Sequence, residues 1–241
     1  MESDDRKPDS LIVPGRSAGD AAHALLKAVA TSTPLIGGLA AELFGALIQP
    51  PLERRRDEWM QSVALALAGL NQDGVNVDSL SKNEEFIDTV LQATHIALRS
   101  HQEEKHEALR NAILNTAIDA APTDMRRQMF LRYVDEFTPE HLGILTLFND
   151  PTDWFAGRGL PFPDMYMGGL SHILEKAFPT LENEREIYDQ IWKDLYQRGL
   201  VNTDGLHTTM SGHGLRASRT SELGKAFLRF MRFTRSTESC P

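Results

Sequence analysis

Residues 195–201 read LYQRGLV and give the clearest signal for the fold of this chain. They close a pattern of helical spacing that begins at Asn183 and runs to Arg198. Gly199 comes next, and glycine often ends a helix because it adopts the left-handed backbone conformation without steric cost. The stretch therefore predicts a helix over 183–198 that stops at Gly199 and leads into extended chain.

The elements around this stretch follow from the same kinds of signal. Two β-capable pieces, residues 206–210 and 213–217, flank a Ser211-Gly212 turn, and a last helix is expected from residue 220, where the sequence reads TSELG. Upstream, Thr138-Pro139-Glu140 combines a capping hydroxyl, a proline and an acid, which is typical of a helix start. A further helix is expected over 164–178.

A helix, the pattern L-x-x-x-G-L-V, a β-hairpin and T-x-x-L-G together resemble the closing half of bacterial winged-helix domains. The resemblance implies a winged-helix-like domain over 138–235, with 236–241 as a tail. In such families the helix before the glycine often reads the major groove of DNA. Here that helix is net acidic, and a helix that enters the groove gains affinity by neutralising phosphates. The pattern therefore favours a structural or protein-docking role over DNA reading.

The charge of the chain is uneven along its length. The formal net charge is −9, yet residues 213–235 hold six basic side chains against Glu222 alone. A local basic field can act even on an acidic protein. The sequence therefore predicts a surface for a protein partner or nucleic acid made by Arg216, Arg219, Lys225, Arg229 and Arg232.

The first part of the chain reads as a disordered lead (1–16) followed by a helical domain (17–137). A helix is expected after Asp20 and is expected to end at Pro34. A second helix, which breaks at Pro50-Pro51, is expected over 35–48. The helix after that break carries one apolar stripe at 3.6-residue spacing, formed by Leu52, Trp59, Val63, Leu67 and Leu70.

The segment 35–48 has two readings. In the first it is a core helix whose glycines allow close packing. In the second it enters a membrane interface while basic residues meet anionic lipid. The contacts expected in the second reading come from Leu35, Leu39, Phe44, Arg54, Arg55 and Arg56.

The longest helical pattern runs from Asn83 to Ile118 and has a polar interruption. Its phase places His101 and Lys105 at the centre of the apolar face. The helix overhangs its neighbours there, kinks near Ser100, or buries a polar pair. On the same helix Glu103 and His106 have the Glu-x-x-His spacing of di-iron bundles, but no second copy follows, so the sequence predicts no metal site.

Composition excludes several classes of function. The one cysteine, Cys240, leaves no disulfide framework or cysteine-rich zinc site. We find no secretory signal and no apolar run of the ~20 residues that a spanning helix needs, which predicts a cytoplasmic protein. A phosphate-binding glycine loop, a Gly-x-Ser-x-Gly elbow and a His-Glu-x-x-His helix are all missing. The sequence thus predicts no cofactor and favours a protein that is not an enzyme.

The order of segments also resembles the abortive-infection alpha family of bacterial proteins. The resemblance lies in a Gly/Ala-rich apolar segment, an arginine-rich helix start, a long central helix and the segment Thr138–Leu145. It implies a bacterial helical protein linked to phage defence and implies no catalytic residues. The leading hypothesis is a non-enzymatic interaction or regulatory protein that docks partners through its C-terminal module. A winged-helix DNA-binding regulator and a membrane-active effector are the alternatives.

Overall fold

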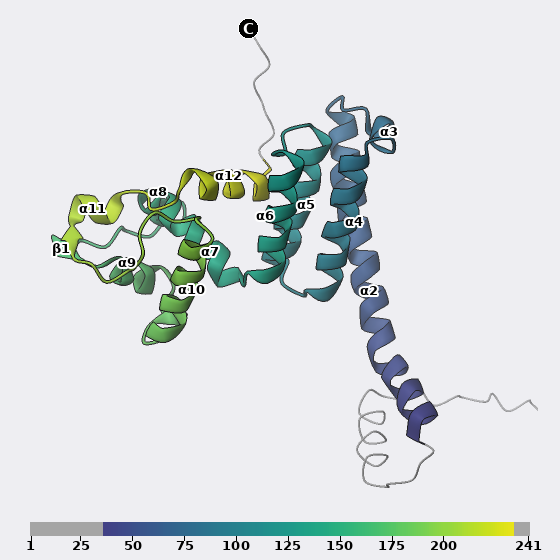
Figure 1. Ribbon diagram of the computed structural model, residues 1–241, viewed down its shortest axis with the longest axis horizontal. Helices are drawn as coiled ribbons and strands as arrows, with labels where there is room; N and C mark the ends of the chain where they lie inside the picture. The colour runs from purple at the N-terminus through teal and green to yellow at the C-terminus, as the bar shows by residue number, and fades with distance from the viewer. Residues whose placement is uncertain (1–35, 234–241) are drawn as a thin grey trace, which may run out of the picture. The chain divides into compact units, whose positions relative to one another are not determined.

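The computed structural model describes residues 36–233, which fall into two compact units divided after Glu58. Helices make up most of the described chain, and one small sheet is present, as Figure 1 shows. This confirms the mainly α-helical class with a small β component. The elements are α2 (Ile36–Gln72), α3 (Val77–Leu80), α4 (Glu84–Arg99), α5 (Glu103–Ala117), α6 (Asp124–Glu136), α7 (Pro139–Asn149), α8 (Pro151–Ala156), β1 (Met167–Gly168), α9 (Leu170–Ala177), the 3₁₀ turn η1 (Pro179–Leu181), α10 (Arg185–Gln197), β2 (Met210–Ser211), α11 (Gly212–Arg216) and α12 (Glu222–Met231).

The helix α2 is continuous through Pro50 and Pro51, so the break that the sequence predicts there is wrong. A proline inside a helix removes one backbone hydrogen bond and crowds the preceding turn, but its φ remains that of a helix. Leucine, alanine, glutamate and arginine, which favour helix, dominate both sides of the pair. The expected lead (1–16) and the expected helix after Asp20 lie outside the described residues.

The apolar stripe of α2 is real from Trp59 onward. Trp59, Val63 and Leu70 are buried, and Leu67 packs against the same core. Leu52, expected as the first member of the stripe, is 45% exposed. The Trp59 Nε1–H donates a hydrogen bond to the hydroxyl of Thr94 on α4 at 3.0 Å. The stripe therefore attaches the C-terminal part of α2 to α4.

The predicted single helix over residues 83–118 is in fact two helices, α4 and α5. Ser100 ends α4 in an extended conformation, and the kink near that residue is the alternative that the structure bears out. His106 on α5 brings its Nε2 to 3.0 Å from the Ala97 carbonyl and 3.1 Å from the Ser100 carbonyl. Because the last carbonyls of a helix lack partners within it, this imidazole closes the end of α4.

An aromatic cluster joins α6 to α12. Phe130 and Tyr133 on α6 place their ring centroids 5.2 and 5.7 Å from that of Phe227. Phe230, one residue short of the end of α12, lies 5.7 Å from Phe130 by the same measure. Aromatic pairs at these separations stabilise a core beyond their buried area. Segments about one hundred residues apart in sequence thus share one core.

The turn at Gly199 is confirmed. Gly199 has φ +70°, and the chain then makes an antiparallel bridge between Val201 and Thr220. The last helix starts as expected, since the Ser221 side chain accepts a hydrogen bond from the Gly224 N–H at 3.0 Å. A Cβ at Gly224 would overlap the Leu200 carbonyl oxygen, so only glycine allows α12 to pack this closely on the turn.

The strands lie elsewhere than expected. Residues 213–217, expected as a strand, lie mostly in α11, because the Ser211 side chain accepts from the Gly214 N–H and caps a helix there. Met210–Ser211 pairs antiparallel with Met167–Gly168 instead. The helix expected over 164–178 begins only at Leu170, because β1 occupies part of the expected first turns. The expected hairpin around Ser211-Gly212 is therefore wrong.

Candidate functional site

A cleft with converging apolar and charged groups lies between α5, α7, α8 and α12. Its volume is about 300 Å³, which is at the lower end of the range for ligand sites in proteins. The side chains that line it come from residues 104 to 232, so the folded core assembles it. They include Glu104, Glu107, Leu142, Trp154, Arg158, Phe178, Leu228, Met231 and Arg232.

The aromatic wall of the cleft depends on the start of α8. The Asp150 side chain accepts a hydrogen bond from the Asp153 N–H at 2.9 Å, and Pro151 occupies the first turn. This cap fixes Trp154, whose ring centroid is 5.5 Å from that of Phe178. The Arg158 guanidinium stacks over the indole at 3.8 Å, a separation at which cation–π attraction is strong.

The indole N–H of Trp154 is the unusual group in this wall. Trp154 is 6% exposed, and its Nε1 has no hydrogen-bond partner among the described residues. A buried donor without an acceptor costs about 1–3 kcal/mol, and the great majority of such groups in folded proteins are satisfied.

The opposite wall of the cleft is acidic. Glu104 and Glu107 lie three residues apart on α5, which places both carboxylates on one face of the helix. Both are exposed, and neither forms a hydrogen bond or ion pair with any residue that the structure describes. Asn111, one turn further on, donates its Nδ2–H to the Met231 carbonyl at 2.9 Å. The two acids therefore lie next to the contact between α5 and α12 and form no bond with a described residue.

Arg158 and Arg232 bring positive charge to the rest of the cleft. Arg232 is exposed and has no side-chain partner within residues 36–233. Leu142, Leu228 and Met231 supply an apolar surface between the charged groups. Chemically, the cleft can hold an apolar side chain whose neighbours carry charges of both signs.

The structure separates the five basic residues that the sequence grouped. Arg216 is exposed and lies 4.0 Å from the Phe162 ring centroid. Arg219 is partly buried: its Nη2 donates to the Gly214 carbonyl at 2.6 Å, and its Nε is enclosed without a partner in the described part of the chain. Arg219 therefore holds the fold of its own loop and is not presented as a free cation.

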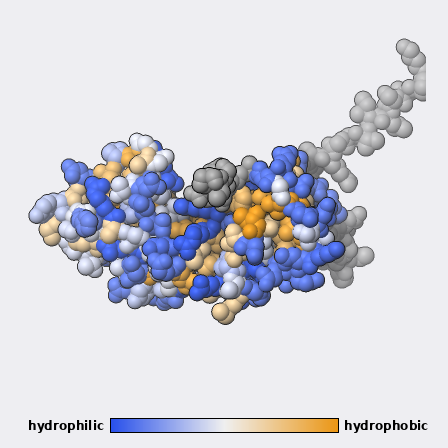
Figure 2. Space-filling model, turned by 90° about the horizontal axis from the view of Figure 1, so that it is seen from above, coloured by the Kyte–Doolittle hydropathy of each residue, from blue (hydrophilic) through white to orange (hydrophobic). Residues whose placement is uncertain are grey.

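The other three basic residues lie on α12 or directly after it. Lys225 and Arg229 are four residues apart on the helix, which places them on one face, and Arg232 follows the helix in an extended conformation. Lys225 is paired with Glu222 at 2.8 Å, whereas the side chain of Arg229 is exposed and forms no hydrogen bond or ion pair with residues 36–233. The view from above in Figure 2 shows a mostly hydrophilic face with smaller apolar areas.

The residues expected to contact a membrane are only partly described. Leu35 and the side chains of Leu39 and Phe44 lie outside the described residues, so this part stays a prediction. Arg54 and Arg56 lie on α2 near Glu58 and Asp57, at 3.6 and 3.7 Å. Arg55 lies between them and is less exposed. Within residues 36–233 we find no helix whose length and hydropathy would let it cross a bilayer.

His141 links α7 to α10 close to the cleft. Its Nδ1 accepts a hydrogen bond from the Thr138 N–H at 3.2 Å, so the proton sits on Nε2, 3.5 Å from the Asp194 carboxylate. The ring stacks on Phe137 with centroids 4.9 Å apart. Burial lowers the pKa of His141, and the hydrogen bond and charge of Asp194 oppose that shift. The imidazole is therefore packed into the core beside the Asp194 carboxylate.

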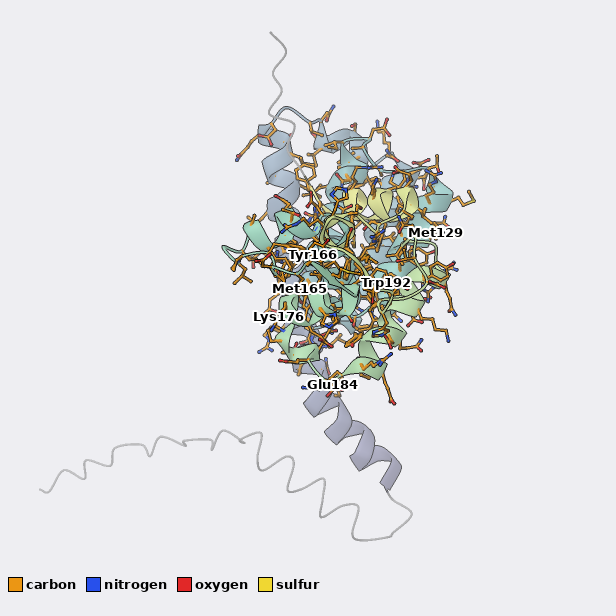
Figure 3. All side chains as sticks on the ribbon, turned by 90° about the vertical axis from the view of Figure 1, so that its left-hand side faces the viewer. Met129, Met165, Tyr166, Lys176, Glu184 and Trp192 are labelled. Carbon is orange, nitrogen blue, oxygen red and sulfur yellow. The ribbon has the colours of Figure 1, made fainter. Side chains whose placement is uncertain are left out.

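An exposed apolar tip lies at β1. Tyr166 is 90% exposed and Met167 is 58% exposed. Figure 3 looks onto this end and shows Met165 and Tyr166 close together. Tyrosine and methionine are enriched in protein interfaces, so the tip offers a second contact surface.

Comparison with protein-family models, curated proteins and solved structures finds no match to this chain. Among the described residues, no group of three or more His, Cys, Asp or Glu side chains is arranged to hold a metal ion. No pattern in the sequence predicts the cleft as a whole. The four-residue spacing of Trp154 and Arg158 is the one local signal for it, and the structure stacks the Arg158 guanidinium, just beyond the end of α8, over the indole.

Proposed function

We propose that this chain is a non-enzymatic interaction protein that binds a segment of a protein partner in the cleft between α5, α7, α8 and α12. The observation that carries the proposal is that Glu104 and Glu107, which pair with no described residue, line the same cleft as an apolar surface and Trp154. Exposed charges that pair with no described residue are available to a partner, and complementary charge sets the specificity and the rate of association.

The chemistry of the walls defines the partner segment. An apolar side chain would pack on Leu142, Leu228 and Met231, and a basic residue beside it would pair with Glu104 and Glu107. An acidic residue on the other side would meet Arg232. Such an arrangement fits one face of an amphipathic helix or an extended peptide with alternating charge.

The test uses the full chain and a library of random 12-residue peptides displayed on phage. We expect the selected peptides to combine an apolar residue with a basic one, and Glu104→Lys/Glu107→Lys to weaken their binding at least tenfold. The control is Glu182→Lys/Glu184→Lys, which makes the same change in charge at two exposed acids outside the cleft. Equal binding by both double variants, or selected peptides without basic residues, would refute the proposal.

The broader setting of this function is also proposed. The helix α10, the turn at Gly199 and the helix α12 support a winged-helix-like module, since they keep the order of that fold. The wing does not support it, because residues 213–217, where the second wing strand was expected, lie mostly in α11. The resemblance to the abortive-infection alpha family supports a bacterial protein linked to phage defence.

DNA binding is the second candidate, and the observation that favours it is the pair of exposed arginines at the end of α12. Arg229 on the helix and Arg232 directly after it have no side-chain partners in the described chain, and binding through them would fall steeply with salt. We expect Arg229→Glu/Arg232→Glu to abolish binding to a short random duplex at low salt. Arg219 is unsuitable for this test, because its guanidinium holds the Gly214 carbonyl. Duplex binding that is unchanged in the double variant would exclude this surface.

A further inference from the structure

A second pocket, more polar than the cleft, lies at the break between α4 and α5. Its volume is about 240 Å³, below the range of most sites for drug-sized ligands. Arg99, Ser100, His101, Lys105 and Asp135 line it. Three of these five can carry positive charge, so the pocket suits a small ligand of negative charge.

Lys105 is the buried cation of this pocket. The residue is only 8% exposed, and its Nζ donates a hydrogen bond to the Asp135 backbone carbonyl at 2.9 Å. That is the only hydrogen bond of the ammonium group to any described residue, while an ammonium has three donors. Burial lowers the pKa of Lys105, the Asp135 carboxylate raises it, and Arg99 lowers it. An anion beside Nζ would relieve the unfavourable burial of its charge.

The remaining charges leave the pocket positive. The one carboxylate that lines it, Asp135, is already engaged by Arg99, whose Nη2 lies 2.8 Å from Oδ2. His101 is exposed and forms no hydrogen bond or ion pair with residues 36–233. Arg99 and Lys105 therefore outweigh Asp135 by one charge before any contribution from His101.

The start of α5 adds to this field. Gln102 precedes the helix, and its side chain caps none of the first N–H groups. The positive end of the helix dipole thus lies at the wall of the pocket without a side-chain cap. Glu103 and Glu104 in the first turn offset part of that field, and neither of them lines the pocket.

We propose that this pocket binds a small oxyanion of the phosphate class. The ammonium of Lys105, the guanidinium of Arg99, the hydroxyl of Ser100 and the imidazole of His101 offer donors that come from two helices and the turn between them. Donors that converge from several directions suit a tetrahedral oxyanion with several acceptor oxygens better than they suit a planar carboxylate.

The experiment is a titration of the full chain with inorganic phosphate at constant ionic strength, followed by backbone amide NMR. We expect the signals of Ser100, His101 and Gln102 to shift with a saturating curve. Lys105→Met should raise the dissociation constant at least tenfold and Arg99→Met at least threefold. Lys225→Met removes an equal charge from α12, away from the pocket, and should leave the constant within a factor of two.

Several results would overturn the proposal. Phosphate that shifts none of these signals, or that binds the Lys105→Met and Arg99→Met proteins as tightly as the unaltered chain, would do so. Chloride or acetate producing the same curve would show a general salt effect instead. Adenosine monophosphate and phosphatidic acid vesicles serve as further arms, and tighter binding of either identifies the source of the phosphate group. Because Arg99 is exposed, its variant keeps the test open should Lys105→Met fail to fold.

Discussion

The helix α5 meets different surroundings in its two halves. In the C-terminal half, the Asn115 Nδ2 lies 2.9 Å from the Phe230 carbonyl and 3.1 Å from the Arg232 carbonyl, and the Thr116 hydroxyl donates to Ala112 at 2.8 Å. In the N-terminal half, Glu104 and Glu107 pair with no described residue. The C-terminal half thus uses Asn115 and Thr116 in the core. In the N-terminal half Lys105 and His106 also form hydrogen bonds, whereas the two acids form none with a described residue.

The difference shows how to separate groups that hold the fold from groups that act on something else. Buried polar groups that belong to the fold are paired, because an unpaired one costs about 1–3 kcal/mol. Asn115 meets that requirement because its Nδ2–H donates to the last carbonyls of α12, which have no partners within their own helix. Glu104 and Glu107, beside an apolar cleft, make no such pairing within the described residues.

The largest effect is expected where the paired half is broken. Asn115→Ala removes the donor that reaches the last carbonyls of α12 and leaves them buried without a partner. We expect the free energy of unfolding to fall by about 2 kcal/mol, as measured by urea denaturation. Glu107→Ala in the other half is the matched control and should change stability by less than about 0.5 kcal/mol. Equal losses in the two variants would erase the distinction between the halves.

Helix boundaries could be predicted from the sequence where a single residue type controls the backbone conformation. Gly199 ends α10 because it adopts a φ of +70°, and Thr138 with Pro139 marks the start of α7. The continuity of α2 through Pro50 could not be read, since a proline only weakens a helix that its neighbours favour. The strands are two residues long, and the paired residues lie 42 and 44 positions apart, so the strands are too short and too distant to leave a periodic pattern.

The candidate site could be predicted far less than the fold. The basic residues after position 213 were visible as a run of charge, but only the structure shows that Arg219 is turned inward while Arg229 is free. Glu104 and Glu107 look in sequence like any solvated helix face. Their significance depends on what α7, α8 and α12 bring opposite them, and no local spacing encodes that arrangement.

A second test compares one substitution at two tryptophans. Trp192 donates its Nε1–H to the Thr203 carbonyl at 3.0 Å, whereas the Nε1 of Trp154 has no acceptor among the described residues. Both rings are buried, so a change to phenylalanine removes similar volume from each. We expect Trp192→Phe to lower the free energy of unfolding by about 1 kcal/mol more than Trp154→Phe does. A loss that is equal, or larger at Trp154, would mean that its N–H is satisfied in solution.

The smallest effect is expected at His141, whose imidazole is buried but lies 3.5 Å from the Asp194 carboxylate. Burial lowers the pKa of this imidazole below its ordinary 6.5, while Asp194 and Glu140 oppose the shift and Arg198 adds to it. As pH falls through about 6.5, the unfolded chain takes up a proton that the folded chain still refuses, so stability falls with pH. The loss ends once pH drops below the lowered folded-state pKa. His141→Gln should therefore show a flatter decline between pH 7.5 and 5.5 in urea denaturation. A decline as steep as that of the unaltered chain would assign the pH dependence to other groups.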